Sequence, residues 1–285
     1  MSSSGSTATF SSRPERVGRH GALRLRFARQ RGETVLAGCR YTVPLQVLAP
    51  VALEGPAAVV SILNPTGGLV GGDRLAIDVV AEPGVHAVLT TPSATKVYRT
   101  EDAQAIQDVT LRLGRGATIE YVPDHTIPFP GSAFCQSVAA EIGEGARLLL
   151  VDAFAAGRVG RGEAWRFDRL ESGLGVRDEA GWLLRDRFRL RGDPAWAGLG
   201  LTEGAAYFAT IVGLGEPGWP TVGEDVAALT AGCADVEAAG GVLARRGWLI
   251  RCLAGTAPAL TETVERLWSA ARRQMLGLGP LALRK

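Results

Sequence analysis

The residues with the greatest chemical potential are acids and cations in four polar segments that follow apolar runs. The segments are NPTGGLVGGDRL (64–75), TTPSATKVYRT (90–100), VPDHTIPFPGSAF (122–134) and DAFAAGRVGRGEAW (152–165). Their candidate functional side chains are Asp73, Lys96, Tyr98, Arg99, Asp124, His125, Asp152 and Glu163. Carboxylates are costly to bury without partnering cations, so these acids indicate a path for a cation or contacts with a basic partner surface. The alternative is that they are surface acids paired with the many arginines.

The first segment contains four glycines, Gly67, Gly68, Gly71 and Gly72, and ends in an acid. A phosphate-binding Walker loop needs Lys and Ser or Thr after its last glycine. Here Asp73 and Arg74 occupy those positions, and a carboxylate would repel a phosphate. We therefore interpret the glycines as tight turns that let the backbone pass close to neighbouring chain segments. Asp73 remains as the functional candidate, pointing into the protein or at a partner.

Other nucleotide-binding and catalytic patterns are weak. GLGEPG (213–218) matches the dinucleotide fingerprint, but Pro217 and Pro220 prevent a helix from starting within it. The chain contains three histidines and no metalloprotease or serine-hydrolase motif. Asp124 and His125 are sequence neighbours, which does not by itself make them an orienting pair. A general base at His125 is one option, and a hydrogen-bonded loop histidine is the favoured one.

Composition limits the classes of partner. The chain has 285 residues and a net charge of +2, so no basic field indicates nucleic acid. No apolar run has the length of a membrane span, and the N-terminus lacks a signal-peptide core. Four widely separated cysteines without a C-x-x-C pair are typical of buried thiols in a reducing compartment. We expect a cytoplasmic protein without membrane contact.

Hydrophobic patterning predicts a mainly β fold from residue 20 to about 222, after a disordered Ser-rich tail over 1–19. LRLRFAR (23–29) and VTLRL (109–113) alternate as half-buried strands, while AAVVSIL (57–63) and RLLLV (147–151) fit strands buried on both faces. Similar turns recur at Gly84, Gly116 and Gly145, which are 32 and 29 residues apart. This spacing predicts layered, solenoid-like stacked sheets whose polar loops gather on one edge.

The C-terminal part, about 223–277, is predicted to be largely helical and to complete a single domain over 20–285. EDVAALTAGCADVEAAGG (224–241) has helical spacing, GWLIRCLAG (247–255) is typical of a strand, and 256–277 is the clearest helix. That last helix can be capped by Thr256 and carries an apolar stripe that includes Trp268 and Met275. The stripe fits core packing, and the alternative is that it offers Trp268 and Met275 to a partner.

The four polar segments closely resemble the motifs of the urease accessory protein D family, UreD, called UreH in some bacteria. The resemblance runs from about residue 20 to 190 and is weaker over 247–276. It implies a non-enzymatic maturation factor with a layered, largely β scaffold. Such proteins bind UreF and, through it, the GTPase UreG, and the complex docks on the urease apoprotein to help deliver nickel.

The resemblance also implies an internal, partly acidic route for nickel. Position by position it assigns the route to Asp73, Asp152 and Glu163. Oxygen ligands of this kind would hold Ni(II) transiently, so no tightly bound cofactor is expected. The Ser-rich tail and the terminal LGPLALRK (278–285) depart from the family pattern, and assigning Trp268 and its helix to UreF is a hypothesis.

Two rival functions remain open. One is a β-solenoid polysaccharide-acting enzyme that uses paired acids such as Asp124 and Asp152, although aromatic content of 6% is low for a sugar cleft. The other is an interaction scaffold without a metal role. Replacing Asp73 or Asp152 by Ala distinguishes the scaffold from the nickel route, because only the route predicts weaker urease activation within an intact complex.

Overall fold

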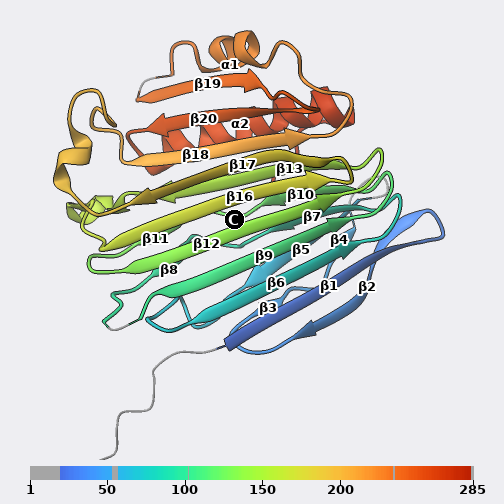
Figure 1. Cartoon of the computed structure of the whole chain (residues 1–285), viewed down its shortest axis with the longest axis horizontal. Coiled ribbons are helices and arrows are strands. Elements are labelled where there is room, and N and C mark those ends of the chain that lie inside the picture. The colour runs from blue at the N-terminus through green and yellow to red at the C-terminus, as the bar shows by residue number, and fades with distance from the viewer. Residues whose placement is uncertain (1–19, 53–56, 102, 234, 284–285) are drawn as a thin grey trace, which may run out of the picture.

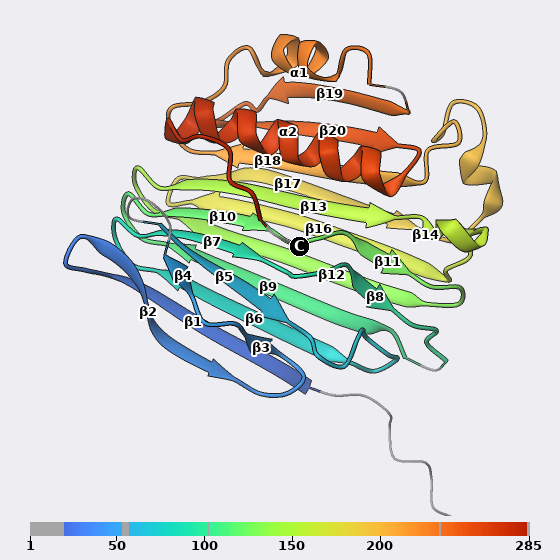
Figure 2. The same ribbon diagram turned by 180° about the vertical axis from the view of Figure 1, so that it is seen from behind.

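A computed structural model describes residues 20–52, 57–101, 103–233 and 235–283. Two stacked β-sheets form most of the molecule, and two helices lie on the far side of the second sheet (Figures 1 and 2). The mainly β, solenoid-like prediction is confirmed. The tail predicted over 1–19 lies outside the described residues. In the described part of the chain, no helix is both long and apolar enough to cross a bilayer.

The first sheet, called sheet A, contains seven strands and is mostly parallel. Its order is β17 (Gly181–Leu190), β16 (Arg169–Asp178), β12 (Ala133–Ile142), β9 (Ala105–Leu113), β6 (Arg74–Ala81), β1 (His20–Gln30) and β2 (Glu33–Tyr41). Only β2 and β17, at its two edges, pair in antiparallel fashion. Polar and apolar positions alternate along its strands, so one face is buried and the other meets solvent.

The second sheet, sheet C, continues into the C-terminal part of the chain. Its order is β19 (Val236–Val242), β20 (Gly247–Ala254), β18 (Tyr207–Leu214), β13 (Arg147–Ala155), β10 (Thr118–Val122), β7 (His86–Thr90), β5 (Ala57–Leu63) and β3 (Gln46–Val47). The short strands β4 (Val51–Ala52), β8 (Thr95–Val97) and β11 (Thr126–Pro128) extend it, and β14 (Gly157–Arg158) pairs with β15 (Glu163–Ala164). Strands β7, β10 and β13 are almost fully buried because they are covered on both faces.

The chain alternates between the sheets through three turns that stack. Gly84, Gly116 and Gly145 lie between β6 and β7, β9 and β10, and β12 and β13, with φ of 69°, 63° and 66°. The backbone N–H of Gly84 donates to Arg115 O at 2.9 Å, and that of Gly116 donates to Glu144 O at 2.9 Å. The repeated turn seen in the sequence is therefore one coil of a solenoid, as predicted.

Two apolar cores correspond to the two interfaces. The larger core fills the space between sheets A and C, with Phe27, Leu111 and Phe134 among its fully buried side chains. The second lies between sheet C and the helices α1 (Val222–Thr230) and α2 (Ala257–Leu276), around Trp219 and Trp248. The C-terminal elements thus cover the outer face of sheet C (Figure 2).

The helix predicted over 224–241 is only half right. Helix α1 ends at Thr230, and Val236–Val242 forms the edge strand β19, which pairs with β20 over seven residues. The strand forms in place of a helix because Gly240 and Gly241 have low helix propensity. Gly240 also lets α1 pack closely on this strand, since a Cβ at that position would lie 3.1 Å from the Val222 side chain. The helix predicted over 256–277 is confirmed as α2, with the Thr256 hydroxyl accepting from Ala259 N–H and Gly277 as a left-handed C-cap.

The cysteines are free thiols, but they are not all buried as predicted. Only Cys252 is buried, Cys135 and Cys233 are half-buried, and Cys39 is exposed on the edge strand β2. An edge strand has no neighbour on one side, so a side chain there stays accessible.

Candidate functional site

The four polar segments stack on one edge of the solenoid, as the sequence predicted. Leu69 N–H donates to Lys96 O and Tyr98 N–H donates to Leu69 O, both at 2.8 Å. The second and third segments meet where Thr95 N–H donates to His125 O at 3.0 Å, and the third and fourth pair in parallel at Thr126 and Phe154. Each segment is therefore one rung in a ladder of backbone hydrogen bonds.

The four glycines of the first rung have two separate physical roles. Gly67 and Gly72 adopt positive φ of 82° and 85°, which other residues adopt at a cost. A Cβ on Gly68 would lie 2.5 Å from Lys96 O, and a Cβ on Gly71 would lie 2.8 Å from Ala103 O. The predicted combination of tight turns and close backbone approach is confirmed.

A cavity of about 210 Å³ lies between the two sheets behind these rungs. Its walls come from both sheets, with Gln107 and Gln136 on sheet A and Tyr121 and Asp152 on sheet C. The rungs contribute Gly67, Gly68, Thr91, Lys96, Asp124 and Thr126. The cavity thus connects a polar interior position to the edge where the polar segments gather.

Asp152 is the buried acid of this cavity and is held by neutral donors. It is 7% exposed, Gln136 Nε2 donates to its Oδ1 at 2.7 Å, and Ser172 Oγ donates to its Oδ2 at 2.8 Å. Gln107 Nε2 in turn donates to Gln136 Oε1 at 3.1 Å. Burial raises the pKa of Asp152 to about 6, although the two hydrogen bonds oppose this shift. Such a carboxyl group exchanges its proton near neutral pH and can accept a cation.

Asp124 and His125 form a pair that sequence adjacency alone did not predict. Asp124 Oδ1 accepts from His125 N–H at 2.8 Å and lies 2.9 Å from His125 Nδ1. Asp124 lines the cavity together with Asp152, while the His125 ring packs edge-on against Tyr207. Thr91 Oγ1, in the second rung, accepts a hydrogen bond from Asp124 N–H at 2.9 Å and holds the chain at Asp124 in place.

Asp73 and Glu163 lie apart from the cavity wall. Asp73 is 3% exposed and accepts from Val70 N–H at 2.9 Å, so it closes the glycine turn. Glu163 accepts from Arg158 Nε at 2.5 Å across the β14–β15 hairpin. The three acids assigned to a nickel route are therefore not brought together, and Asp152 is the one that lines the cavity.

The remaining candidates of the second rung have distinct surroundings. Lys96 is exposed at the cavity mouth, and Tyr98 packs edge-on against Phe129 while its hydroxyl donates to Gly67 O at 3.3 Å. The Arg99 side chain lies against Gly131. Tyr98 and Arg99 therefore brace neighbouring rungs. Among the described residues, no group of three or more His, Cys, Asp or Glu side chains could hold a metal ion.

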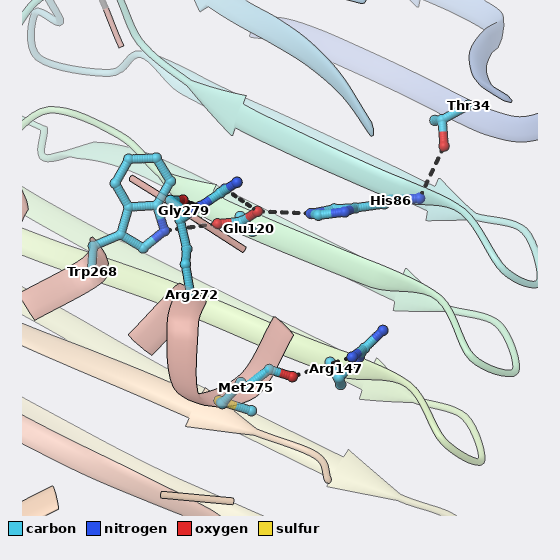
Figure 3. A network of polar contacts seen from close by, with 8 residues as sticks. All are labelled: Thr34, His86, Glu120, Arg147, Trp268, Arg272, Met275 and Gly279. Atoms are coloured by element: carbon cyan, nitrogen blue, oxygen red, sulfur yellow. Dashed lines mark hydrogen bonds and ion pairs between the residues drawn. The ribbon is translucent and has the colours of Figure 1, made fainter. Parts of the chain in front are cut away.

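A second polar network, which the sequence reasoning missed, anchors helix α2 (Figure 3). Glu120 of β10 is fully buried, and its carboxylate accepts from Trp268 Nε1 at 2.8 Å and from Arg272 Nη1. His86 Nε2 lies 2.7 Å from the same carboxylate. Trp268 and Met275 are 2% and 1% exposed, so the apolar stripe is core and does not offer these side chains to a partner.

These missed residues had only a weak sequence signal. Glu120 interrupts the apolar run ATIEYV, and Gln136 takes an inward position in the alternation of β12. A polar residue at an inward strand position needs a partner, but the partners of Glu120 on α2 lie 148 and 152 residues away. No spacing rule could have joined them.

Comparison with known proteins gives one consistent result. The family model described as UreD urease accessory protein matches residues 19–285. A protein of Deinococcus radiodurans named urease accessory protein UreD is 35% identical over 273 residues, covering 94% of this chain and 95% of that protein. Proteins of the same name from Alkalilimnicola ehrlichii and Cupriavidus necator are 35% and 33% identical, covering 98% and 92% of this chain and 94% and 92% of theirs.

The match includes the stacked motif segments as well as the C-terminal elements that cover sheet C. The relatives are named as accessory proteins, in keeping with a role in urease maturation. The chain belongs to the UreD urease accessory protein family.

Proposed function

We propose that this chain is a non-catalytic urease maturation factor that acts in the cytoplasm with UreF and UreG. In this proposal the complex docks on the urease apoprotein, and Ni(II) passes through the chain as cargo. Family membership supports the maturation role. The observation that carries the nickel route is the cavity between the sheets, which has Asp152 in its wall and the motif rungs at its edge.

The chemistry of the cavity suits transit of a cation. Asp152 and Asp124 offer carboxylate oxygen atoms in the cavity wall, which bind Ni(II) less firmly than thiolate or imidazole clusters. Because burial raises the pKa of Asp152 to about 6, a proton competes with the metal ion below that pH. Asp124 would receive the ion at the mouth. Asp73 and Glu163 keep a structural part in this proposal, since each closes a turn or hairpin.

The polysaccharide-acting enzyme has less support. Asp124 and Asp152 do line one cavity, but its volume of about 210 Å³ is below the range of about 300–1,000 Å³ typical of ligand pockets. Tyr121 is its one aromatic lining residue in the described part of the chain, so it offers no platform for sugar rings. A scaffold without a metal role remains the competing proposal.

The decisive experiment separates nickel transfer from assembly. Asp152→Asn keeps the size of the side chain and removes its charge, so we expect a five- to tenfold lower nickel content of urease matured in its presence. Nickel would be measured by mass spectrometry on purified urease, and retention of UreF by co-purification. Glu224→Gln, an exposed acid of α1, is the matched control. Full nickel loading with Asp152→Asn would favour the plain scaffold.

The pH dependence sharpens the same test. The Asp152 carboxylate is lost as pH falls through about 6, so nickel loading should decline between pH 7 and 5.5. With Asp152→Asn the loading should be low and nearly independent of pH over this range. A wild-type profile that is flat through pH 6 would contradict a role of Asp152 in transit.

A further inference from the structure

Among the residues that the structure describes, none forms a layer over the outer face of sheet A. Figure 1 shows its strands at the front of the molecule, while α1 and α2 lie against sheet C. Its core strands are parallel, and parallel sheets in globular proteins usually have both faces covered. Seven strands at about 4.8 Å spacing and about 30 Å long give roughly 850 Å², close to the area that each partner contributes to a standard protein interface.

Small side chains form the floor of this face. One row across the sheet, read from the strand register, runs Arg24, Asp78, Thr110, Ala139, Gly175 and Arg185. The neighbouring row places Ser137 and Gly173 beside them. Grooves of about 780, 670 and 490 Å³ hollow the same face. A low floor between raised edges can accept protruding side chains from a partner.

Arginines form a bank at each side of the floor. The first bank, on β1, β2 and β9, consists of Arg24, Arg26, Arg40 and Arg112. Asp78 and Glu82 lie among them, with Arg24 and Arg112 at 3.9 and 3.8 Å from Asp78. Asp108, exposed on the same face of β9 as Arg112, is a third acid. Four guanidinium groups thus meet three carboxylates, which leaves one positive charge in excess.

The second bank, on β16 and β17, is organised by a buried carboxylate. Glu171 is 2% exposed and pairs with Arg169, Arg187 and Arg189, whose side chains are 41%, 64% and 59% exposed. Arg185 stacks on Trp182 at 5.0 Å and has no acidic partner among the described residues. Each guanidinium has five N–H donors, so most donors still point to solvent. Four arginines and one carboxylate leave an excess of three positive charges in this bank, and Glu171 fixes the positions of three of the arginines.

We propose that this arginine face docks a folded protein whose contact surface is rich in Asp and Glu. Preformed guanidinium groups bind carboxylates with paired hydrogen bonds and lose little side-chain entropy on contact. Asp78, Asp108, Glu82 and Glu141 are interspersed among the arginines. A protein surface can place its acids against the guanidinium groups and its cations against these carboxylates, whereas a phosphate backbone carries negative charge alone, so the face fits a protein better than nucleic acid. The proposal is independent of nickel transfer.

A charge-reversal experiment on the full chain tests this surface. The probe is a fluorescent 20-residue poly-L-glutamate, measured by anisotropy at low salt. We expect saturable binding that Arg185→Glu with Arg187→Glu weakens at least tenfold. The control is Arg115→Glu with Arg273→Glu, which changes the net charge by the same amount but lies in a turn and on α2. This control should weaken binding less than threefold. Arg185→Glu alone breaks no ion pair among the described residues and removes only the stacking on Trp182, so its loss of binding at unchanged thermal stability reports on the surface charge.

Three results would overturn the proposal. They are the absence of saturable binding, equal losses in the face and control variants, and binding of a 20-base-pair DNA duplex as tight as that of poly-L-glutamate. The last result would assign the face to nucleic acid. Thermal unfolding of every variant accompanies the measurement.

Discussion

Glu120 and Glu171 are two buried glutamates held by arginine, one on each sheet, and their surroundings differ sharply. Glu120 is 0% exposed and its partner Arg272 is 6% exposed, so the whole pair lies between sheet C and α2. Glu171 is 2% exposed, but its three arginines lie 41–64% exposed on the bare face of sheet A. The Glu–Arg pair is buried with its helix on sheet C, whereas on sheet A the arginines of the pair remain exposed to solvent.

The difference shows how burial of the cation changes the role of an ion pair. When both charges are buried, removing one leaves the other without solvent or partner, so the pair behaves as a clamp between distant parts of the chain. When the cations are exposed, water compensates them, and the pair mainly sets their positions. Burial tends to raise the pKa of Glu171, but the three arginine contacts outweigh it and keep the pKa below its usual range.

Asp152 is a third buried carboxylate and completes the comparison. Its donors are Gln136 and Ser172, which are neutral, and burial raises its pKa to about 6. A buried acid without a cation costs stability, so its presence in the cavity is better explained by function than by folding.

Breaking the clamp should have the largest effect. Arg272→Ala leaves the Glu120 carboxylate buried beside His86 and should lower the free energy of unfolding by about 3–5 kcal/mol. Chemical denaturation followed by tryptophan fluorescence measures the change. Arg273→Ala, the exposed neighbour on α2, should cost about 0.5 kcal/mol or less. Equal losses would show that Glu120 does not depend on Arg272.

Removing one hydrogen bond from the clamp should have an intermediate effect. Trp268→Phe keeps most of the ring packing and deletes the N–H that donates to Glu120 at 2.8 Å, so we expect a loss of about 1.5–3 kcal/mol. Trp182→Phe on the arginine face, where the ring is 53% exposed, is the control and should change stability by less than about 0.5 kcal/mol. A loss no greater than this control would contradict the bond to Glu120.

Replacing Asp152 should change stability in the opposite direction. Its folded pKa of about 6 lies above the ordinary value of 3.8, so the folded state binds the proton more tightly than the unfolded state. The free energy of unfolding therefore falls as pH rises from about 4 to above 6. Asp152→Asn should therefore stabilise the protein by about 1–2 kcal/mol at pH 7.5, after the loss of one hydrogen bond. Near pH 4 the gain should vanish. Thermal unfolding at both pH values checks this, and destabilisation at pH 7.5 would refute it.

The smallest effect is expected where the cations are exposed. Glu171→Gln leaves Arg169, Arg187 and Arg189 in contact with water and keeps an amide oxygen as acceptor, so stability should change by about 1 kcal/mol or less. Glu120→Gln is the matched comparison and should cost at least twice as much. If the two substitutions cost the same, exposure of the arginines does not distinguish the two sites.

The sequence by itself determined the local structure and the family. Alternation gave the strands β1 and β9 of sheet A, the recurring Gly84, Gly116 and Gly145 turns gave the stacked coils, and Thr256 marked the start of α2. These features depend on interactions between residues close in the chain, which a linear pattern records. The motif segments were recognisable for the same reason, because each turn requires its own glycines.

Only the tertiary structure decided how charges are compensated. It separated Asp73 and Glu163 from the cavity that Asp152 lines, and turned 236–242 from a predicted helix into the edge strand β19. It also joined Glu120 to Arg272 across 152 residues and left the arginines around Glu171 exposed. Burial and partnering of a charge depend on which surfaces the folded chain brings together, and the sequence order of the residues does not contain that information.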